Sequence, residues 1–330
     1  MKQPPRSPNA FHVVHGGAEG VDAGALAGAV VAIGNFDGVH RGHRAVIGAA
    51  LTRARALGRK AAALTFTPHP RQFFRPQDGL FLLSSERDKL RLLATTGLDG
   101  AVIMRFDAAL AATSAQDFIE RILVESLGVG GAAIGFDFHF GHKRAGSPAY
   151  LAGQGATLGF DVDIVPPLED EGRPVSSGAV RTALTDGKVV EAAELLGAPW
   201  FIAGEVIHGE KRGRDLGFPT ANIRLDPACG LKHGIYAVRM DVDGTRYDGV
   251  ASFGRRPMFD NGAPLLEVFL FDFSGDLYGK RVDVAFIGWI RSEQKFASID
   301  ALKRQMDDDA ARAKDALARS GGAFPILGMI

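Results

Sequence analysis

Several features are scarce in this sequence of 330 residues, and each scarcity excludes a class of protein. The single cysteine, Cys229, excludes an internal disulfide and a zinc site built from several cysteines. Lys and Arg number 38, as do Asp and Glu, so the basic excess typical of nucleic-acid-binding proteins is missing. The most apolar early stretch, residues 24–34, is far shorter than the roughly 20 residues of a membrane span, and the N-terminal segment MKQPPRSPNA lacks the apolar region of a signal peptide. We therefore expect a cytoplasmic protein that binds neither nucleic acid nor membranes.

The remaining composition is that of an ordinary globular protein. Apolar residues make up 46% and charged residues 23% of the chain, which excludes wholesale disorder. At about 150 residues per domain, the length predicts two domains, and a chain of this size can bury a sizeable core. We expect a monomer or a weak homo-oligomer.

The first half of the chain alternates between strand-like and helix-like segments. We expect strands at 30–33, 61–66, 101–104, 132–136 and 162–165, and helices from 40 to 58, from Ser85, from Ser114, at 177–184 and at 189–196. Such alternation predicts an α/β domain with a parallel, doubly wound sheet, whose ligands bind at the carboxyl ends of the strands. We interpret residues 1–28 as a frayed leader, 29–186 as this domain and 187–199 as a linker.

The second half has the two-residue period of antiparallel strands. Residues 236–242 alternate, an Asp243-Gly244 hairpin signal follows, and further strand-like runs occupy 265–273 and 282–290. Strands without intervening helices predict a small antiparallel β-barrel within 200–330, followed by a helix from about Ser298.

A glycine-rich turn with two histidines links the first predicted strand to its helix. Its glycines and the helix N-terminus suit a phosphate chain, and His40 and His43, three residues apart, could donate hydrogen bonds to phosphate oxygens as charge develops on them. That chemistry suits attack on an α-phosphate with pyrophosphate leaving. Two alternatives remain: the two histidines could be half of a metal site, or the segment could simply be a tight turn. The expected ATP-binding residues of the turn are Gly34, Asn35, Phe36, Asp37 and Gly38.

Polar residues also follow the other predicted strands. The segments are Thr67-Pro68-His69-Pro70-Arg71, the stretch 135–141 with Asp137, and Ser176-Ser177-Gly178-Ala179-Val180-Arg181. Serine hydroxyls and an arginine at a helix start make a second anion clamp. Each segment alone could be structural, but together they place polar groups at one edge of one sheet.

The second half holds a basic glycine-rich loop over residues 208–218 and a lone carboxylate. The loop suits phosphates, although a solvated surface turn would look the same. Thr220 and Asn222 point to one side of an extended segment, and neutral oxygen ligands beside ATP phosphates suit Mg²⁺. Glu267 stands in an otherwise apolar strand, so it is a general base, the partner of a buried arginine, or a cap of the barrel end.

These motifs resemble the bacterial bifunctional riboflavin kinase/FAD synthetase family. His40-Arg41-Gly42-His43 matches the His-x-Gly-His signature of its nucleotidyltransferase domain, and residues 176–181 resemble its Ser-Ser-Thr-x-Ile-Arg loop. The Gly-Phe-Pro-Thr-Ala-Asn segment at 217–222 and the Leu-Glu-Val strand at 266–268 resemble its kinase module. The resemblance implies two reactions: riboflavin and ATP give FMN and ADP, and FMN and ATP give FAD and pyrophosphate, with Mg²⁺ in both.

The resemblance also implies roles for individual residues. In the adenylyltransferase, His40, His43 and Arg181 are expected to be catalytic, and Ser176 and Ser177 to bind ATP with residues 34–38. Flavin binding is expected of His69, Asp137 and Arg291. In the kinase, Glu267 is the expected base, Thr220 and Asn222 hold Mg-ATP, and the ATP-binding residues are Gly209, Lys211, Gly213, Gly217 and Phe218.

Some positions depart from the family pattern. In the adenylyltransferase half, Gly178 replaces a threonine, His139 an arginine and Thr67 an acidic residue; in the kinase half, Met258 replaces a threonine and Phe269 a histidine. One alternative is therefore an active kinase with a weakened adenylyltransferase. Others are a non-catalytic flavin or nucleotide sensor, and a nucleotidyltransferase acting on another small molecule such as pantetheine phosphate.

Overall fold

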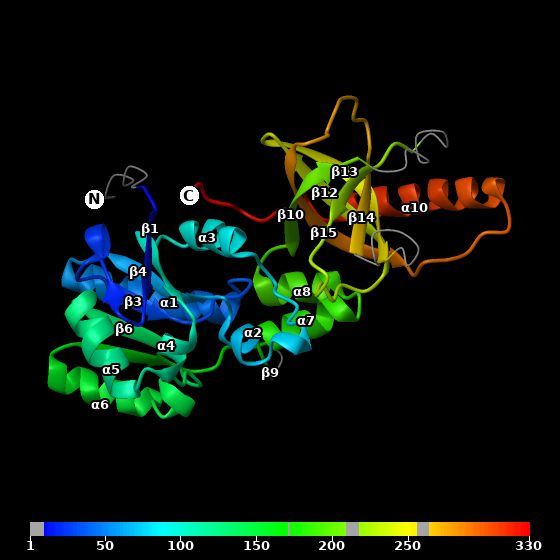
Figure 1. Ribbon diagram of the computed structural model, residues 1–330. Coiled ribbons are helices and arrows are strands. Elements are labelled where there is room, and N and C mark those ends of the chain that lie inside the picture. Colours follow the sequence, from blue (N-terminus) through cyan, green and yellow to red (C-terminus); the bar gives the residue numbers. More distant parts are fainter. Residues whose placement is uncertain (1–9, 171, 209–217, 256–263) are drawn as a thin grey trace, which may run out of the picture. The chain divides into compact units, whose positions relative to one another are not determined.

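The computed structural model describes residues 10–170, 172–208, 218–255 and 264–330 (Figure 1). Contacts divide the chain into two compact units. Unit 1 holds Met1–Leu80, Ser84–Val175 and Ile326–Ile330, and unit 2 holds Phe81–Leu83 and Ser176–Pro325. Each unit has its own architecture.

Unit 1 is built on a seven-stranded sheet in the order β2-β1-β5-β4-β3-β6-β7. All neighbouring strands are parallel except β1 and β2, so the predicted parallel α/β sheet is confirmed. The strands are β1 His12–Gly17, β2 Gly20–Val21, β3 Val30–Ile33, β4 Ala61–Thr67, β5 Gly100–Arg105, β6 Gly131–Gly135 and β7 Asp161–Val165.

The interpretation of residues 1–28 as a frayed leader is wrong for 12–21. Strand β1 pairs with β5 from His12 to Gly16 and extends the sheet. Its side chains are mostly half-buried, and β1 lies next to the two-residue edge strand β2 rather than in the centre of the sheet. Such a strand carries no strong apolar run, and this is why the sequence pattern did not reveal it.

Helices follow most strands of unit 1 and cover the sheet. They are α1 Arg41–Leu57, α2 Pro70–Phe74, α3 Glu86–Ala94, α4 Ala108–Ala112, α5 Ala115–Asp117, the π-helix η3 Phe118–Ser126 and α6 Pro148–Leu158, with 3-10 turns η1 Gly24–Leu26, η2 Pro76–Asp78 and η4 His142–Arg144. Helix α1 packs on β3, β4 and β6, and η3 packs on side chains of the same sheet that include Val31 and Leu64. Central strands buried in this way are apolar throughout, as β3 is.

The predicted helix ends of unit 1 are confirmed by their caps. Ser85 and Ser114 each accept a hydrogen bond from the backbone N–H three residues on, at 3.1 and 2.9 Å. Gly58 ends α1 in the left-handed conformation. The short strands β8 Glu169–Asp170 and β9 Arg173–Pro174 form a separate antiparallel pair.

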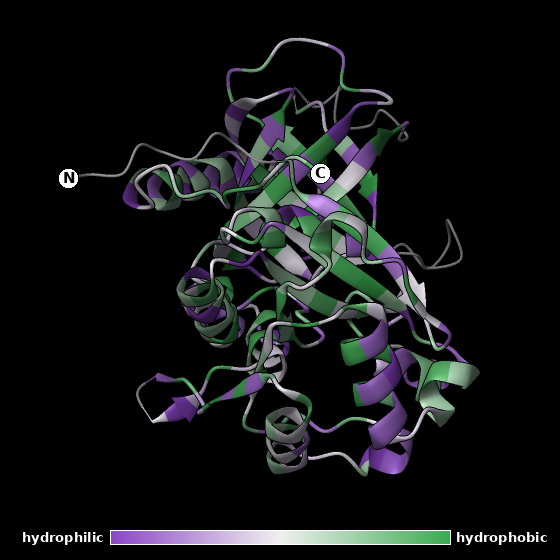
Figure 2. Cartoon of the chain, turned by 90° about the vertical axis from the view of Figure 1, so that its left-hand side faces the viewer, coloured by the Kyte–Doolittle hydropathy of each residue, from purple (hydrophilic) through white to green (hydrophobic). Residues whose placement is uncertain are grey.

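Unit 2 contains the predicted antiparallel barrel, which is closed in the order β10-β11-β14-β13-β12-β15. Alternate residues of β14 are buried, and hydrophobic and hydrophilic residues alternate along the barrel strands (Figure 2). Asp243 and Gly244 both have positive φ and form the predicted hairpin turn. The strands are β10 Phe201–Ile207, β11 Ala221–Arg224, β12 Gly234–Val242, β13 Thr245–Arg255, β14 Pro264–Leu270 and β15 Arg281–Arg291, and the last helix is α10 Ile299–Arg319.

Two helices, α7 Ser177–Thr185 and α8 Val189–Leu196, belong to unit 2 as well. The backbone N–H of Lys232 donates to the carbonyl of Leu184 at 3.1 Å, and the ring of Trp289 lies against Gly187. The compact unit thus begins at Ser176. Helix α8 lies within the segment 187–199, whose role as a linker stays a prediction.

Candidate functional sites

The turn after β3 has an unusual backbone. Phe36 and Val39 have φ values of 50° and 44°, and Gly38 has 79°. Positive φ is a real outlier for a β-branched residue, and such residues typically cost about 1–3 kcal/mol each. Because the side chains of Phe36 and Val39 are buried, the packing around the turn holds the backbone in this shape.

A carboxylate and a serine brace this turn from inside. Asp37, only 3% exposed, accepts hydrogen bonds from the backbone N–H of Ser84 at 3.0 Å and from its hydroxyl at 3.3 Å. The Ser84 oxygen accepts from the backbone N–H of Gly38 at 3.0 Å. These contacts link the turn to the residues just before α3. Sequence reasoning missed Ser84 because nothing in the pattern connects positions so far apart in the chain.

The two histidines begin α1 as a pair. His40 caps the helix, with its Nδ1 accepting from the backbone N–H of His43 at 3.2 Å. The two rings stack with centroids 3.6 Å apart, and the edge of Phe36 meets the His43 ring at 5.3 Å. Because Nδ1 of His40 accepts a hydrogen bond, the neutral ring carries its proton on Nε2, which makes Nε2 a donor.

Gly42 between these histidines is a position of close approach. A Cβ atom there would lie 3.0 Å from the carbonyl oxygen of Val175 and 3.1 Å from the His40 ring. A nearby ion pair joins Arg41 to Asp170 at 2.5 Å. The start of α1 therefore packs on the segment that leads into residues 176–181.

The other polar segments of unit 1 follow the strands on either side of β3. His69 caps α2, its Nδ1 accepting from the backbone N–H of Arg71 at 3.1 Å. Asp137 is exposed, and its carbonyl lies 3.0 Å from Nδ1 of His139. Because β4, β3 and β6 are parallel neighbours, the turn after β3, His69 and Asp137 all follow the same edge of the sheet.

The serine loop belongs to unit 2. Ser176 caps α7 by accepting from the backbone N–H of Ala179 at 3.1 Å, and Ser177 is the first residue of that helix. Nε of Arg181 donates to the carbonyl of Phe81 at 2.5 Å. At Gly178 a Cβ atom would meet only the Ser176 hydroxyl, at 3.6 Å, so a side chain has room there.

In the barrel, register brings three polar residues side by side. Asn222 on β11 pairs with Glu267 on β14, which pairs with Ser252 on β13. Directly opposed residues place their side chains on one face of a sheet. Asn222 is buried and donates from Nδ2 to the carbonyl of Thr220 at 3.3 Å. The structure therefore unites the predicted base with a predicted magnesium ligand, and adds Ser252, which the sequence pattern did not single out.

Of the remaining residues predicted for the kinase site, only Phe218 is among those that the structure describes. Gly209, Lys211, Gly213 and Gly217, like the departure at Met258, lie outside the described residues. Phe218 is described, and its ring packs edge-on against that of Phe269 at 4.9 Å.

Arg291 makes a bidentate ion pair with Asp309 of α10. Its Nε and Nη2 donate to the carboxylate at 2.8 and 2.6 Å, and Asp309 is buried. The remaining Nη1 donates to the carbonyl of Ser292 at 2.8 Å. Asp309, which the sequence pattern did not reveal, thus fixes the orientation of Arg291, whose flavin-binding role stays a prediction.

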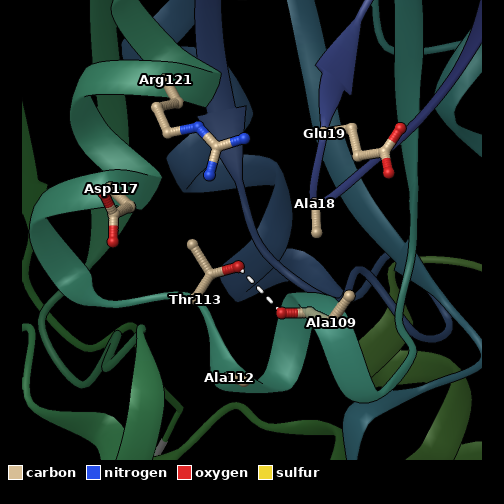
Figure 3. Close-up of a pocket in the computed structure, with 7 residues that line it drawn as sticks. All are labelled: Ala18, Glu19, Ala109, Ala112, Thr113, Asp117 and Arg121. Atoms are coloured by element: carbon tan, nitrogen blue, oxygen red, sulfur yellow. Dashed lines mark hydrogen bonds between the residues drawn. The ribbon is translucent and has the colours of Figure 1, made fainter.

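A pocket of about 340 Å³ lies elsewhere in unit 1 (Figure 3). It opens between the β1–β2 turn and the α4–η3 segment, and none of the predicted site residues lines it. Its lining residues are Ala18, Glu19, Ala109, Ala112, Thr113, Asp117 and Arg121.

Within the described ranges, no three His, Cys, Asp or Glu side chains cluster as a metal site would require. Among the residues that the structure describes, no helix has the length and apolarity to cross a membrane.

Comparison with known proteins gives a match for each half of the chain. Residues 23–179 match the FAD synthetase family model, and residues 196–317 match the riboflavin kinase model. A bifunctional riboflavin kinase/FMN adenylyltransferase of Pseudomonas fluorescens is 42% identical over 89% of this chain and 94% of its own length. The chain belongs to this bifunctional family.

Further relatives of the family agree. Proteins of the same description from Escherichia coli K12 and Bacillus subtilis are 40% and 37% identical, covering 87% and 86% of this chain and 92% and 91% of their own lengths. A solved structure from Streptococcus pneumoniae, titled a macrolide-efflux protein, is 32% identical, with a TM-score of 0.80 over 88% of this chain and 94% of that one. The resemblance identified from sequence motifs is confirmed, and with it a transferase of two activities.

Proposed function

We propose that this protein carries out two consecutive ATP-dependent reactions at separate sites. The barrel of unit 2 phosphorylates riboflavin to FMN, releasing ADP, and the α/β domain transfers AMP from ATP to FMN, giving FAD and pyrophosphate. The observation that carries this proposal is the coincidence of each family region with one set of motifs. The FAD synthetase match contains the histidine turn, and the riboflavin kinase match contains Asn222 and Glu267.

In the kinase site, we assign Glu267 as the base that accepts the proton of the ribityl 5′-hydroxyl. Its cross-strand neighbour Asn222 supports that role, because it brings a Mg-ATP ligand beside the nucleophile. Since Nδ2 of Asn222 donates to the carbonyl of Thr220, its amide oxygen remains as the end that suits a hard cation. Thr220 and Asn222 would hold Mg²⁺, which neutralises charge on the phosphates while the hydroxyl attacks in line.

In the adenylyltransferase site, His40 and His43 act as hydrogen-bond donors rather than nucleophiles. The FMN phosphate attacks the α-phosphate of ATP, and negative charge moves toward the departing pyrophosphate. Donors fixed at a helix N-terminus stabilise that charge without reorganising. The stacked geometry of the two rings supports this role, because it holds both imidazoles on the same first turn of α1.

We also propose that the two units are separable domains of a cytoplasmic monomer or weak homo-oligomer, and that the boundary expected at 187–199 is better placed before α7, at Ser176. A fragment of residues 176–330 keeps α7 and its hydrogen bond from Lys232 to Leu184, whereas one starting at 187 loses them. Both should phosphorylate riboflavin, and the longer fragment should have the higher melting temperature. Two inactive, insoluble fragments would contradict the separation.

The experiment that tests the main proposal is an incubation of the full chain with riboflavin and Mg-ATP, followed by separation of FMN and FAD. We expect FMN to appear first and FAD afterwards, with pyrophosphate equal to the FAD formed. Accumulation of FMN with little FAD would favour the second candidate, a kinase with a weakened adenylyltransferase, which the departures at Thr67, His139 and Gly178 suggest. Formation of neither product would overturn both and favour a sensor.

A further inference from the structure

A buried lysine lies beneath the histidine turn, and no motif includes it. Lys89 on α3 is only 7% exposed. Its ammonium contacts three neutral oxygens: the hydroxyl of Thr65 at 3.0 Å, the carbonyl of Asn35 at 3.3 Å and the carbonyl of Phe66 at 3.4 Å. The Thr65 hydroxyl itself donates to the carbonyl of Asn35 at 3.1 Å.

The three acceptors of Lys89 lie at the carboxyl ends of two neighbouring strands. Asn35 belongs to the turn after β3, and Thr65 and Phe66 lie at the end of β4, its parallel neighbour. Lys89 therefore ties together the carboxyl ends of two adjacent strands, at the edge where ligands bind in such sheets. Three residues after Phe66 the chain reaches His69, and five residues after Asn35 it reaches His40.

Burying an ammonium is expensive unless hydrogen bonds compensate for the lost water, and Lys89 makes such contacts to three oxygens. Burial lowers the pKa of Lys89 from its ordinary value, and the carboxylates of Asp37 and Glu86 oppose that shift. The hydrogen bonds fix the two carbonyls in position and offset part of the cost. The strained residues Phe36 and Val39 lie in the same turn, which needs such external support.

We propose that Lys89 is a positioning residue for adenylyl transfer. Through the carbonyls of Asn35 and Phe66 it holds the turn that aims His40 and His43 at the phosphates of ATP. This inference rests on the proposed function of unit 1. It predicts that loss of Lys89 lowers kcat more than it raises the KM for ATP, because misalignment weakens the transition state most.

The test uses Lys89→Met in the full chain, with FAD formation measured from supplied FMN and ATP. We expect kcat to fall on the order of 10²-fold, as for a misplaced catalytic group, while riboflavin phosphorylation by the same molecules stays normal. Lys89→Gln keeps an N–H donor on a side chain that is one bond shorter and uncharged, and it should recover part of the lost rate. Lys60→Met is the matched control, because Lys60 donates to the carbonyl of Ala25 at 2.9 Å but is exposed.

A second, milder variant keeps the proposal testable if Lys89→Met causes unit 1 to misfold. Thr65→Val removes the hydroxyl between Lys89 and Asn35 without burying or removing a charge, and it should lower kcat in the same direction by a smaller factor. A kcat within twofold of wild type for Lys89→Met, or an unchanged kcat for Thr65→Val, would overturn the proposal. So would a loss confined to KM, or no recovery in Lys89→Gln. Absence of FAD formation by the wild type would instead refute the proposed function itself.

Discussion

The two candidate sites are built in opposite ways. In unit 1 the histidines stand on an irregular turn, with positive φ at Phe36 and Val39, held by buried polar groups from distant segments. In unit 2, Asn222, Glu267 and Ser252 stand on regular strands, and cross-strand register alone sets their neighbours. We expect the barrel site to be sensitive to the identity of its side chains, and the turn site to be sensitive also to its supports.

The largest expected effect is on the barrel site. Glu267→Gln keeps the shape of the side chain but removes the base, so the rate of FMN formation should fall on the order of 10³-fold. Conversion of supplied FMN to FAD should remain normal in the same preparation. Near-normal FMN formation would show that Glu267 has only a structural part in its strand, the alternative that the sequence left open.

The second effect is on the turn itself. His43→Ala removes one donor that acts in the transition state, so kcat for FAD formation should fall roughly 10²–10³-fold with a similar apparent affinity for ATP. Kinetics of both activities measure this, and FMN formation should be intact.

The metal-site alternative for His40 and His43 predicts a different result. It requires a bound transition metal in the wild type, which metal analysis of the purified protein would detect. Stoichiometric zinc that disappears together with activity in His43→Ala would overturn the role as phosphate-charge donors.

These two sites also differ in how far sequence could predict them. The strand–helix alternation predicted the sheet of unit 1, and the two-residue period predicted the barrel, because both patterns follow directly from burial of one or both faces. Strand β1 was not predicted, because its side chains are only partly buried and its sequence has no strong apolar run. The motif residues could be named from short segments, but Ser84 and Lys89 reach the turn from α3 and its start, and no local pattern encodes such contacts.

A third prediction tests the supports of the turn through Gly42. A Cβ atom there would press on the Val175 carbonyl and the His40 ring, and overpacking of this kind typically costs about 1–3 kcal/mol. Gly42→Ala should therefore displace His40 and lower FAD formation by roughly tenfold, at the lower end of that cost, while FMN formation is unchanged.

The matched control is Gly48→Ala on the same helix, where a Cβ atom would meet nothing within 4 Å. That variant should keep both activities. If the two variants behave alike, the close approach at Gly42 has no bearing on the geometry of His40.

The smallest expected effect is a gain, and it concerns the departure at Gly178. A side chain has room there, with only the Ser176 hydroxyl at 3.6 Å, and the residue lies in the first turn of α7. Gly178→Thr restores the hydroxyl of the family loop. One additional hydrogen bond to a phosphate oxygen is worth about 1 kcal/mol, so FAD formation should rise roughly fivefold.

Gly178→Val is the control, because it has nearly the same shape without the hydroxyl. A gain in the threonine variant alone would show that the natural chain has a weakened adenylyltransferase. Equal rates in all three proteins would show that the serine clamp is already complete without that hydroxyl, and that Gly178 does not distinguish this chain from a fully active member of its family.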